Sequence, residues 1–445
     1  MFISTKRALS PAIKNSLWMI ADQFGSKLLL TGLMVLMARS LGPANFGILS
    51  LALSIVLVCK DTLAPLGLSG VFVRELIENP TRHDELLGSA LAMRTLSGFG
   101  ALLLALAIFD YMGPGRDNLF QIGVVLSTVI VLPSIIHLYF ESALASWRNA
   151  ISNLTAHATA AVATLLMYLL NTHILGFAYA LALLYFVQFS TQLYQFVTVQ
   201  GGLAHLRIRL QTMGSLLSES WPLIISGAAA VVYNRIDVVM LGALAPMTEV
   251  GTYAAASRVA ESTTIIGLAI AASVFPSIIR ARQQNKSSVE APMIRLASCL
   301  LYCGIAISVS LILVAPHVIN FLFDTGFQES IKILQVYSLS IPFIYLGLFL
   351  SKWLIVERLV RYSIVRHFLG AFVNVILNAA LIPYYGGVGA AIGTVAAHCF
   401  AVCVVCVGSK PLRPALTIML ASTLWPFRWI IQQWQSLGRI WHGNA

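Results

Sequence analysis

The sequence has very few charged residues for its length. Only 10% of its 445 residues are Asp, Glu, Lys or Arg, whereas 58% are apolar. A soluble domain carries about 25% charged residues, so these charges are too few to cover the surface of a soluble particle. The mean hydropathy of +0.84 agrees with this. The composition therefore excludes a cytoplasmic enzyme and a secreted binding module, and it predicts a multispan membrane protein.

Cysteine and the short motifs of soluble chemistry are also scarce. All six cysteines lie within apolar segments, which argues against a secreted disulfide framework and a solvated zinc site. The sequence contains no Walker motif, no Ser-His-Asp set and no metal-ligand spacing. The net charge of +11 comes from basic residues scattered between apolar runs, whereas a DNA-binding surface gathers them on one soluble face. We therefore expect no metal, no cofactor and no nucleic-acid partner.

Apolar runs of helical length give twelve candidate spans, since a bilayer core takes about 20 helical residues. The first six are Ser16 to Ala38, Ile48 to Val73, Leu86 to Phe109, Phe120 to Phe140, Leu154 to Leu170 and Ile174 to Val199. The second six are Leu216 to Leu241, Gly251 to Ile279, Ile294 to Leu313, Ile333 to Val356, Ile364 to Ile382 and Gly386 to Val407. The sequence thus predicts an all-α polytopic membrane protein with about twelve transmembrane helices.

A thirteenth apolar stretch, Leu416 to Ile431, is interrupted by Pro426 and Arg428. Trp425 and Trp429 lie in this stretch, and tryptophan is enriched at the headgroup layer of a membrane. We interpret the stretch as interfacial, and a further membrane span is the alternative.

The distribution of basic residues predicts the orientation, because cytoplasmic loops carry an excess of Lys and Arg. With the N-terminus inside, 19 of the 28 basic residues fall in inward segments. Only Arg39, Arg116 and Lys332 fall in outward loops, and the other six lie within spans. Both termini are therefore predicted to be cytoplasmic.

The most polar connection near the middle of the chain divides the spans six and six. We predict an N-terminal six-helix lobe over residues 1–200, a cytoplasmic linker over 201–215, a C-terminal six-helix lobe over 216–408 and a cytoplasmic or interfacial tail over 409–445. A weak internal repeat supports two lobes, since Leu-Gly at 41–42 precedes Gly47 as Leu-Gly at 241–242 precedes Gly251.

Ten charged residues are the candidate functional residues, because each lies within a predicted span. The cations are Lys27, Lys60, Arg94, Arg235, Arg258 and Lys352, and the acids are Asp22, Asp61, Asp237 and Glu261. A charge at mid-membrane costs about 2.5 to 3.5 kcal/mol on insertion scales. These side chains should therefore face a polar space or one another. The two lobes are predicted to surround a central cationic cavity.

An alternative is that some of these charges are internal ion pairs. Arg258 and Glu261 are three residues apart on one helix, and Lys60 precedes Asp61. Lys27 has no acid three or four residues away, and the same holds for Arg94 and Lys352. For these three cations, an anionic ligand and pairing across helices both stay open.

Four stretches resemble bacterial polysaccharide flippases of the Wzx type, which belong to the multidrug/oligosaccharidyl-lipid/polysaccharide exporter superfamily. The stretches are Arg39-Ser-Leu-Gly-Pro-Ala-Asn-Phe-Gly, Glu219-Ser-Trp-Pro-Leu running to Arg235-Ile-Asp237, Val250-Gly-Thr-Tyr-Ala-Ala-Ala-Ser-Arg258, and Asn374-Val-Ile-Leu-Asn378 running to Gly386-Gly-Val-Gly-Ala-Ala. The resemblance covers almost the whole chain.

The resemblance implies a flippase that carries undecaprenyl-pyrophosphate-linked oligosaccharides, such as O-antigen units of lipopolysaccharide, to the outer leaflet of the bacterial inner membrane. It implies alternating access driven by an ion or a potential, with the six cations as pyrophosphate or cavity groups and the four acids as coupling candidates. Lys27, Lys60 and Arg258 match, by span alone, the cavity cations of peptidoglycan-precursor flippases. Membrane lipid, a polysaccharide polymerase and chain-length proteins are the implied partners.

Two alternatives differ in activity. A multidrug or cation exporter of the same superfamily would favour an acidic or aromatic cavity over a cationic one. A glycan polymerase or ligase that uses polyprenyl pyrophosphate would need large outward loops, whereas the predicted outward loops are short. We therefore expect a transporter and not an enzyme. The glycan and the coupling ion are left open.

Overall fold

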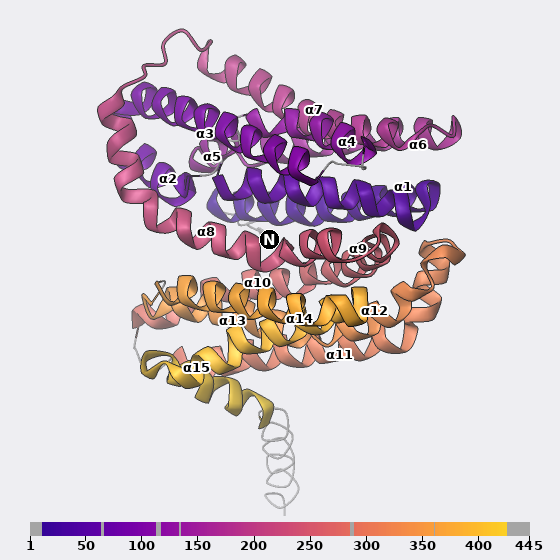
Figure 1. The fold of residues 1–445 in the computed structure, drawn as a ribbon. Helices are drawn as coiled ribbons and strands as arrows, with labels where there is room; N and C mark the ends of the chain where they lie inside the picture. Colours follow the sequence, from indigo (N-terminus) through magenta and orange to yellow (C-terminus); the bar gives the residue numbers. More distant parts are fainter. Residues whose placement is uncertain are drawn as a thin grey trace, which may run out of the picture. The chain divides into compact units, whose positions relative to one another are not determined.

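A computed structural model describes residues 11–63, 66–112, 117–132, 135–284, 289–359 and 361–424, and every regular element in these ranges is helical. Figure 1 shows the α-helices in chain order. They are α1 (Pro11–Leu63), α2 (Leu68–Glu78), α3 (His83–Met112), α4 (Asp117–Ser127), α5 (Ile136–Ser142), α6 (Trp147–Leu169), α7 (Ile174–Gln200), α8 (Leu210–Leu244), α9 (Met247–Ser262), α10 (Thr264–Gln284), α11 (Glu290–Leu322), α12 (Glu329–Ser338), α13 (Ile341–Val356), α14 (Arg361–Cys399) and α15 (Val405–Gly408). A 3₁₀ segment, Thr128–Val131, follows α4, and a π-helical turn, Phe400–Val404, follows α14.

Within the ranges that the structure describes, ten helical segments are long and apolar enough to cross a membrane. Two of them have double length, Leu17–Leu63 with 47 residues and Arg361–Gly408 with 48. Each is broken at a glycine, Gly42 with φ 66° and Gly386 with φ 51°. Glycine adopts such positive φ values without steric cost. Because both arms of each segment reach about 20 residues, the ten segments supply about twelve spanning lengths, and the predicted all-α polytopic fold is confirmed.

Several predicted spans are not continuous helices. Within the span predicted from Ile48 to Val73, the observed helix α1 ends at Leu63 and a new helix, α2, begins at Leu68. Gly67 between them has φ 61° and lies against α8, since a Cβ atom there would meet the carbonyl oxygen of Ser220 at 2.7 Å. Hydropathy continues across this break, so the apolar run alone could not reveal it.

The chain forms two compact units. The first comprises Met1–Ala254 and Leu322–Gly326, and the second comprises Ala255–Phe321 and Phe327–Ala445. The boundary lies beyond the predicted linker 201–215, because α8 packs on α1, α2 and α3 of the first unit. The predicted division into two six-helix lobes stays a prediction.

Gly47 and Gly251, which occupy corresponding places in the internal repeat, face each other in the first unit. A Cβ atom on Gly47 would collide with the backbone carbonyl of Met247, and one on Gly251 would collide with that of Pro43. Glycine at both positions allows α1 and α9 to approach backbone to backbone. The repeat therefore marks a contact that depends on the absence of side chains.

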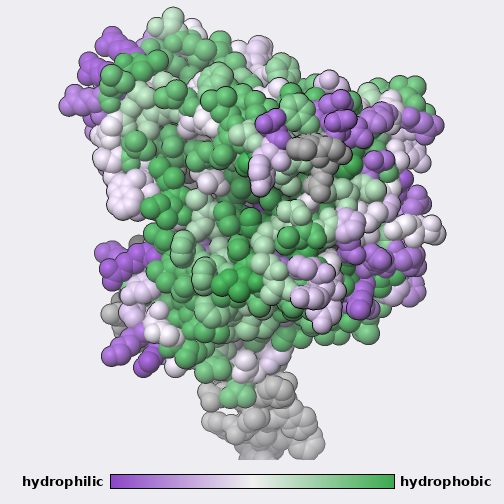
Figure 2. Space-filling model, viewed as in Figure 1, coloured by the Kyte–Doolittle hydropathy of each residue, from purple (hydrophilic) through white to green (hydrophobic). Residues whose placement is uncertain are grey.

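The first unit is held by an apolar cluster shared by α2, α3, α5, α7 and α8. The Tyr139 ring in this cluster makes T-shaped contacts with the rings of Phe196 and His83, at 5.2 Å and 5.6 Å between centroids. Outside such clusters, large apolar side chains are exposed, for example Leu103 at 67%. Figure 2 shows that apolar side chains cover the middle of the helices on the drawn face, whereas hydrophilic ones gather near the helix ends. This distribution is what a lipid environment favours.

In the second unit, α13 packs against α10 and α14, and α12 packs against α14. The Tyr345 hydroxyl donates to the carbonyl of Thr263 at 2.7 Å. Residues 413–424 are helical and lie on α11, where Ser298 donates to the carbonyl of Ser422 at 3.0 Å. The rest of the predicted tail, 425–445, lies outside the described residues.

Candidate functional site

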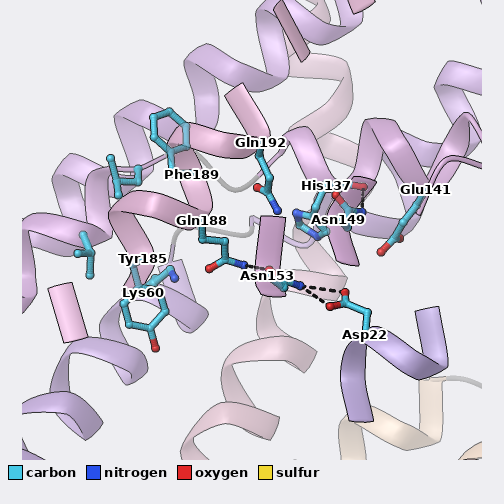
Figure 3. A pocket seen from close by; sticks show the side chains of 12 residues that line it. Asp22, Lys60, His137, Glu141, Asn149, Asn153, Tyr185, Gln188, Phe189 and Gln192 are labelled. Carbon is cyan, nitrogen blue, oxygen red and sulfur yellow. Dashed lines mark hydrogen bonds between the residues drawn. The ribbon is translucent and has the colours of Figure 1, made fainter. Parts of the chain in front are cut away.

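A polar cavity of about 220 Å³ lies inside the first unit (Figure 3). Its walls come from α1, the segment between α4 and α5, α5, α6 and α7. The lining residues are Asp22, Lys60, Val129, Leu132, His137, Glu141, Asn149, Asn153, Tyr185, Gln188, Phe189 and Gln192. Two of the predicted charges, Asp22 and Lys60, are thus brought to one cavity although 38 positions separate them in the sequence.

Asp22 is fixed by amide and hydroxyl donors. The Asn153 amide nitrogen lies 2.8 Å from Oδ1 and 2.9 Å from Oδ2 of Asp22, and the Ser26 hydroxyl donates to Oδ1 at 3.2 Å. Gln188 in turn donates to Oδ1 of Asn153 at 2.6 Å, so α1, α6 and α7 are joined by one chain of hydrogen bonds (Figure 3). The arrangement holds a carboxylate at a defined place in the cavity wall.

Lys60 lies on the other side of the cavity, with its ammonium group 4.5 Å from the centroid of the Tyr185 ring. A cation over an aromatic face is attracted by the ring quadrupole. Of the six predicted cations, Lys60 is the one among the residues that line the cavity.

Amide side chains form most of the remaining polar lining. Asn149 and Asn153 are one turn apart on α6, and Gln188 and Gln192 are one turn apart on α7. An amide both donates and accepts hydrogen bonds, so these groups suit a ligand rich in hydroxyls. They were not among the predicted site residues because they carry no charge. Their i, i+4 spacing within or beside predicted spans was the available signal.

The cavity is not predominantly cationic. It contains one lysine and two carboxylates, since Glu141 lies on α5 near Asp22. The predicted central cationic cavity involves both lobes of the chain. It therefore stays a prediction.

Other predicted residues of the first unit do not line this cavity. Asp61 borders a separate cavity of about 320 Å³ with Gly67 and Gly70 of the α2 region and residues of α8. Arg94 is 3% exposed on α3, and Lys27 is half-buried on α1. Asp237 is buried on α8 and accepts a short hydrogen bond from the Tyr253 hydroxyl. Arg235 is half-buried two residues before it.

The other three predicted residues belong to the second unit. Arg258 and Glu261 are half-buried on α9. Lys352 lies on α13, and its ammonium group is 4.7 Å from the centroid of the Phe275 ring on α10. Among the described residues, no group of three or more His, Cys, Asp or Glu side chains could hold a metal ion.

Charged residues of α2 and α8 form ion pairs in the first unit. Arg74 on α2 donates to Glu219 on α8 at 2.5 Å and to the neighbouring Glu75 at 3.2 Å. These hydrogen bonds, to Glu219 first and to Glu75 second, raise the pKa of the Arg74 guanidinium above its ordinary value. Arg74 thus connects α2 to α8 in its charged form.

Comparisons with known proteins agree with this architecture. A family model described as polysaccharide biosynthesis protein matches residues 12–282, which is more than half of the chain. A Shigella dysenteriae protein named "Putative O-antigen transporter" is 27% identical over 183 residues, which cover 41% of this chain and 45% of that protein. The match therefore spans less than half the length of this curated relative.

Two solved structures share the fold at low sequence identity. The lipid II flippase MurJ, in an inward closed conformation, has a TM-score of 0.73 at 16% identity, covering 94% of this chain and 92% of that chain. An inward-facing multidrug resistance MATE family transporter of the MOP superfamily has a TM-score of 0.67 at 13% identity, covering 89% and 94%. These proteins are named as transporters or flippases, and none is named as an enzyme.

Proposed function

The chain belongs to the polysaccharide biosynthesis protein family, and we propose that it is a flippase for undecaprenyl-pyrophosphate-linked oligosaccharide units. This membership agrees with the resemblance to Wzx-type flippases. In the proposal, the chain spans the bacterial inner membrane with both termini in the cytoplasm. It moves the carrier lipid from the cytoplasmic to the outer leaflet by alternating access.

The polar cavity of the first unit is the observation that carries this proposal. Its amides offer hydrogen-bond donors and acceptors to glycan hydroxyls at membrane depth, where water is scarce. Lys60 offers a positive charge to a phosphate. Lysine binds phosphate as a point charge, without the bidentate geometry of arginine. The cavity thus combines the two kinds of contact that a lipid-linked glycan requires.

We propose Lys60 as the first pyrophosphate contact. The further proposed cations are Lys27, Arg94 and Arg235 in the first unit and Arg258 and Lys352 in the second. Their charges would compensate that of the pyrophosphate along its path, because charged side chains within membrane helices mark substrate pathways.

Coupling to an ion or to the membrane potential is a further part of the proposal. Asp22 is the acid with the most favourable position, because it lines the cavity and Asn153 holds its carboxylate. Asp61, Asp237 and Glu261 are the other candidates, and Asp237 is already engaged by Tyr253. Protonation or sodium binding at Asp22 would weaken its contact with Asn153 and so alter how α1 is held against α6.

A multidrug or cation exporter is a second candidate function. The observation in its favour is the pair of carboxylates, Asp22 and Glu141, which would attract a cationic substrate into the same cavity.

For the flippase function, a polysaccharide polymerase and chain-length proteins would act on the delivered glycan and are the proposed partners.

Substitution of Lys60 in cells that depend on this chain for surface glycan tests the proposal. We expect Lys60→Gln to reduce glycan export about tenfold or more, since a hydrogen bond to a charged group is worth about 1.5 to 3 kcal/mol. Lipid-linked glycan should accumulate at the inner face. Lys60→Arg should retain part of the export, and Lys14→Gln, an exposed site on the same helix, should have no effect. Normal export in Lys60→Gln, with drug resistance lost in an Asp22→Asn variant, would instead favour the multidrug exporter.

A further inference from the structure

Glu141 gives the polar cavity a negative charge that phosphates and hydroxyls on a ligand do not balance. The lining carries one cation, Lys60, and two carboxylates, Asp22 and Glu141. Charges attract or repel one another more strongly at the low dielectric of a protein interior than in water. A pyrophosphate at Lys60 adds further negative charge to the cavity, so a ligand that also carries a positive group near the carboxylates fits better than a purely anionic one.

The end of α5 holds Glu141 in the cavity wall. Phe140, the residue before it, is 1% exposed and belongs to the apolar cluster of the first unit. Neighbouring residues on a helix do not share a face, so the burial of Phe140 directs Glu141 away from that cluster. The chain turns directly afterwards, where Leu144 has φ 53° and its amide donates to the carbonyl of Glu141 at 3.1 Å.

The carboxylate of Glu141 is open to a ligand. Within the part of the chain that the structure describes, no hydrogen bond or ion pair engages it. Asp22 differs, because Asn153 and Ser26 donate hydrogen bonds to its oxygens. Figure 3 shows Glu141 and Asp22 on one side of the cavity and Lys60 on the other. The cavity thus has a basic end and an acidic end, and Glu141 is the open acceptor of the acidic end.

Asn149 supplies a second open acceptor in the lining of the same cavity. The residue is 5% exposed, and its amide nitrogen donates to the carbonyl of His137 at 3.0 Å. This bond fixes which way the amide points, since only its nitrogen can donate. The Oδ1 atom of Asn149 is buried and has no hydrogen-bond partner among the described residues. A buried polar atom without a partner costs free energy, so a ligand that donates a hydrogen bond to this oxygen gains affinity.

We propose that Glu141 and Asn149 bind a positively charged amino group on the glycan, while Lys60 binds the pyrophosphate. This inference rests on the proposed flippase function and names the class of glycan, one that contains an amino sugar. An ammonium group donates three hydrogen bonds and carries a positive charge, whereas a hydroxyl offers a hydrogen bond without charge. The amides of Asn153 and Gln188 lie between the two ends of the cavity and are placed to contact sugar hydroxyls (Figure 3).

Binding of two synthetic lipids to the purified full chain tests the amino-group site. The lipids are undecaprenyl-pyrophosphate glucosamine and undecaprenyl-pyrophosphate glucose, which differ only by an amine in place of a hydroxyl. Their dissociation constants are measured in detergent at neutral pH, where most of the amine is protonated. We expect the glucosamine lipid to bind about tenfold more tightly, because hydrogen bonds between ionised groups are stronger than neutral ones.

Substitution of Glu141 assigns the preference to this residue. Glu141→Gln should abolish the preference for the glucosamine lipid and leave the binding of the glucose lipid nearly unchanged. Glu329→Gln is the matched control and should keep the preference, because Glu329 is exposed on α12 in the second unit. Gel filtration of each variant reports whether the fold is retained.

The possible failures are distinguishable. Equal binding of the two lipids by the wild-type chain would overturn the amino-group site and leave the flippase proposal standing, and this comparison needs no variant. A preference that persists in Glu141→Gln would remove Glu141 from the site. Binding of neither lipid by the wild-type chain would count against the flippase function itself, and the inference would fall with it.

Discussion

The contact between Asp22 and Asn153 can be measured as a coupling energy. Hydrogen bonds to charged groups are worth about 1.5 to 3 kcal/mol, whereas those between membrane helices average about 0.6 and reach about 1.7 kcal/mol. The Asn153 nitrogen lies within 2.9 Å of both carboxylate oxygens, so this contact belongs at the top of the second range. We therefore expect a coupling free energy of about 1.5 kcal/mol.

The assay is a double-mutant cycle of Asp22→Ala and Asn153→Ala, with the free energy of unfolding measured by titration with a denaturing detergent. The matched control replaces Asn153→Ala by Thr155→Ala, because Thr155 lies on the exposed side of α6 and bonds only within that helix. The control cycle should be additive within about 0.5 kcal/mol. A coupling between Asp22 and Asn153 no larger than in the control would refute the hydrogen-bonded chain across the cavity.

Three further predictions concern topology, packing and charge. A membrane-impermeant thiol reagent applied to intact cells should label Asn45→Cys and not Gln211→Cys, on a background without native cysteines; the reverse pattern would contradict cytoplasmic termini. Gly251→Ala should lower the amount of folded protein severalfold in a fluorescence-detected gel filtration, because the added methyl collides with the backbone of α1; unchanged yield would argue against the close contact. Arg258→Gln should abolish glycan export, and adding Glu261→Gln should not restore it; recovery at normal protein level would assign Arg258 a purely structural ion pair.

The membrane class and the number of spanning lengths could be predicted from the sequence because they depend on local hydropathy. The helix breaks could not, since Gly67 takes its positive φ where α2 packs against α8, and that contact joins distant parts of the chain. The boundary of the first unit after Ala254 likewise depends on which helices pack together. Hydropathy reports which segments enter lipid and carries little information about which helices pack together.

Only part of the lining of the polar cavity could be expected from the sequence. Asp22 and Lys60 were predicted as site residues because holding a charge within a membrane costs free energy. Asn149, Asn153, Gln188 and Gln192 were not, because a neutral amide is tolerated in many helices. Their role becomes visible when α6 and α7 come together and Gln188 bonds to Asn153. Which charges share a cavity is likewise a property of packing, as the separation of Lys60 and Asp61 into different cavities shows.

Transport by the purified chain tests the central claim most directly. The protein is reconstituted in liposomes whose inner leaflet holds an undecaprenyl-pyrophosphate oligosaccharide, and an external glycosidase reports its arrival at the outer surface. We predict that the wild-type chain exposes the glycan much faster than protein-free liposomes do, and that Lys60→Gln loses most of this rate. A wild-type rate equal to that of protein-free liposomes, under both an imposed potential and a sodium or proton gradient, would contradict the assignment as a lipid-linked glycan flippase.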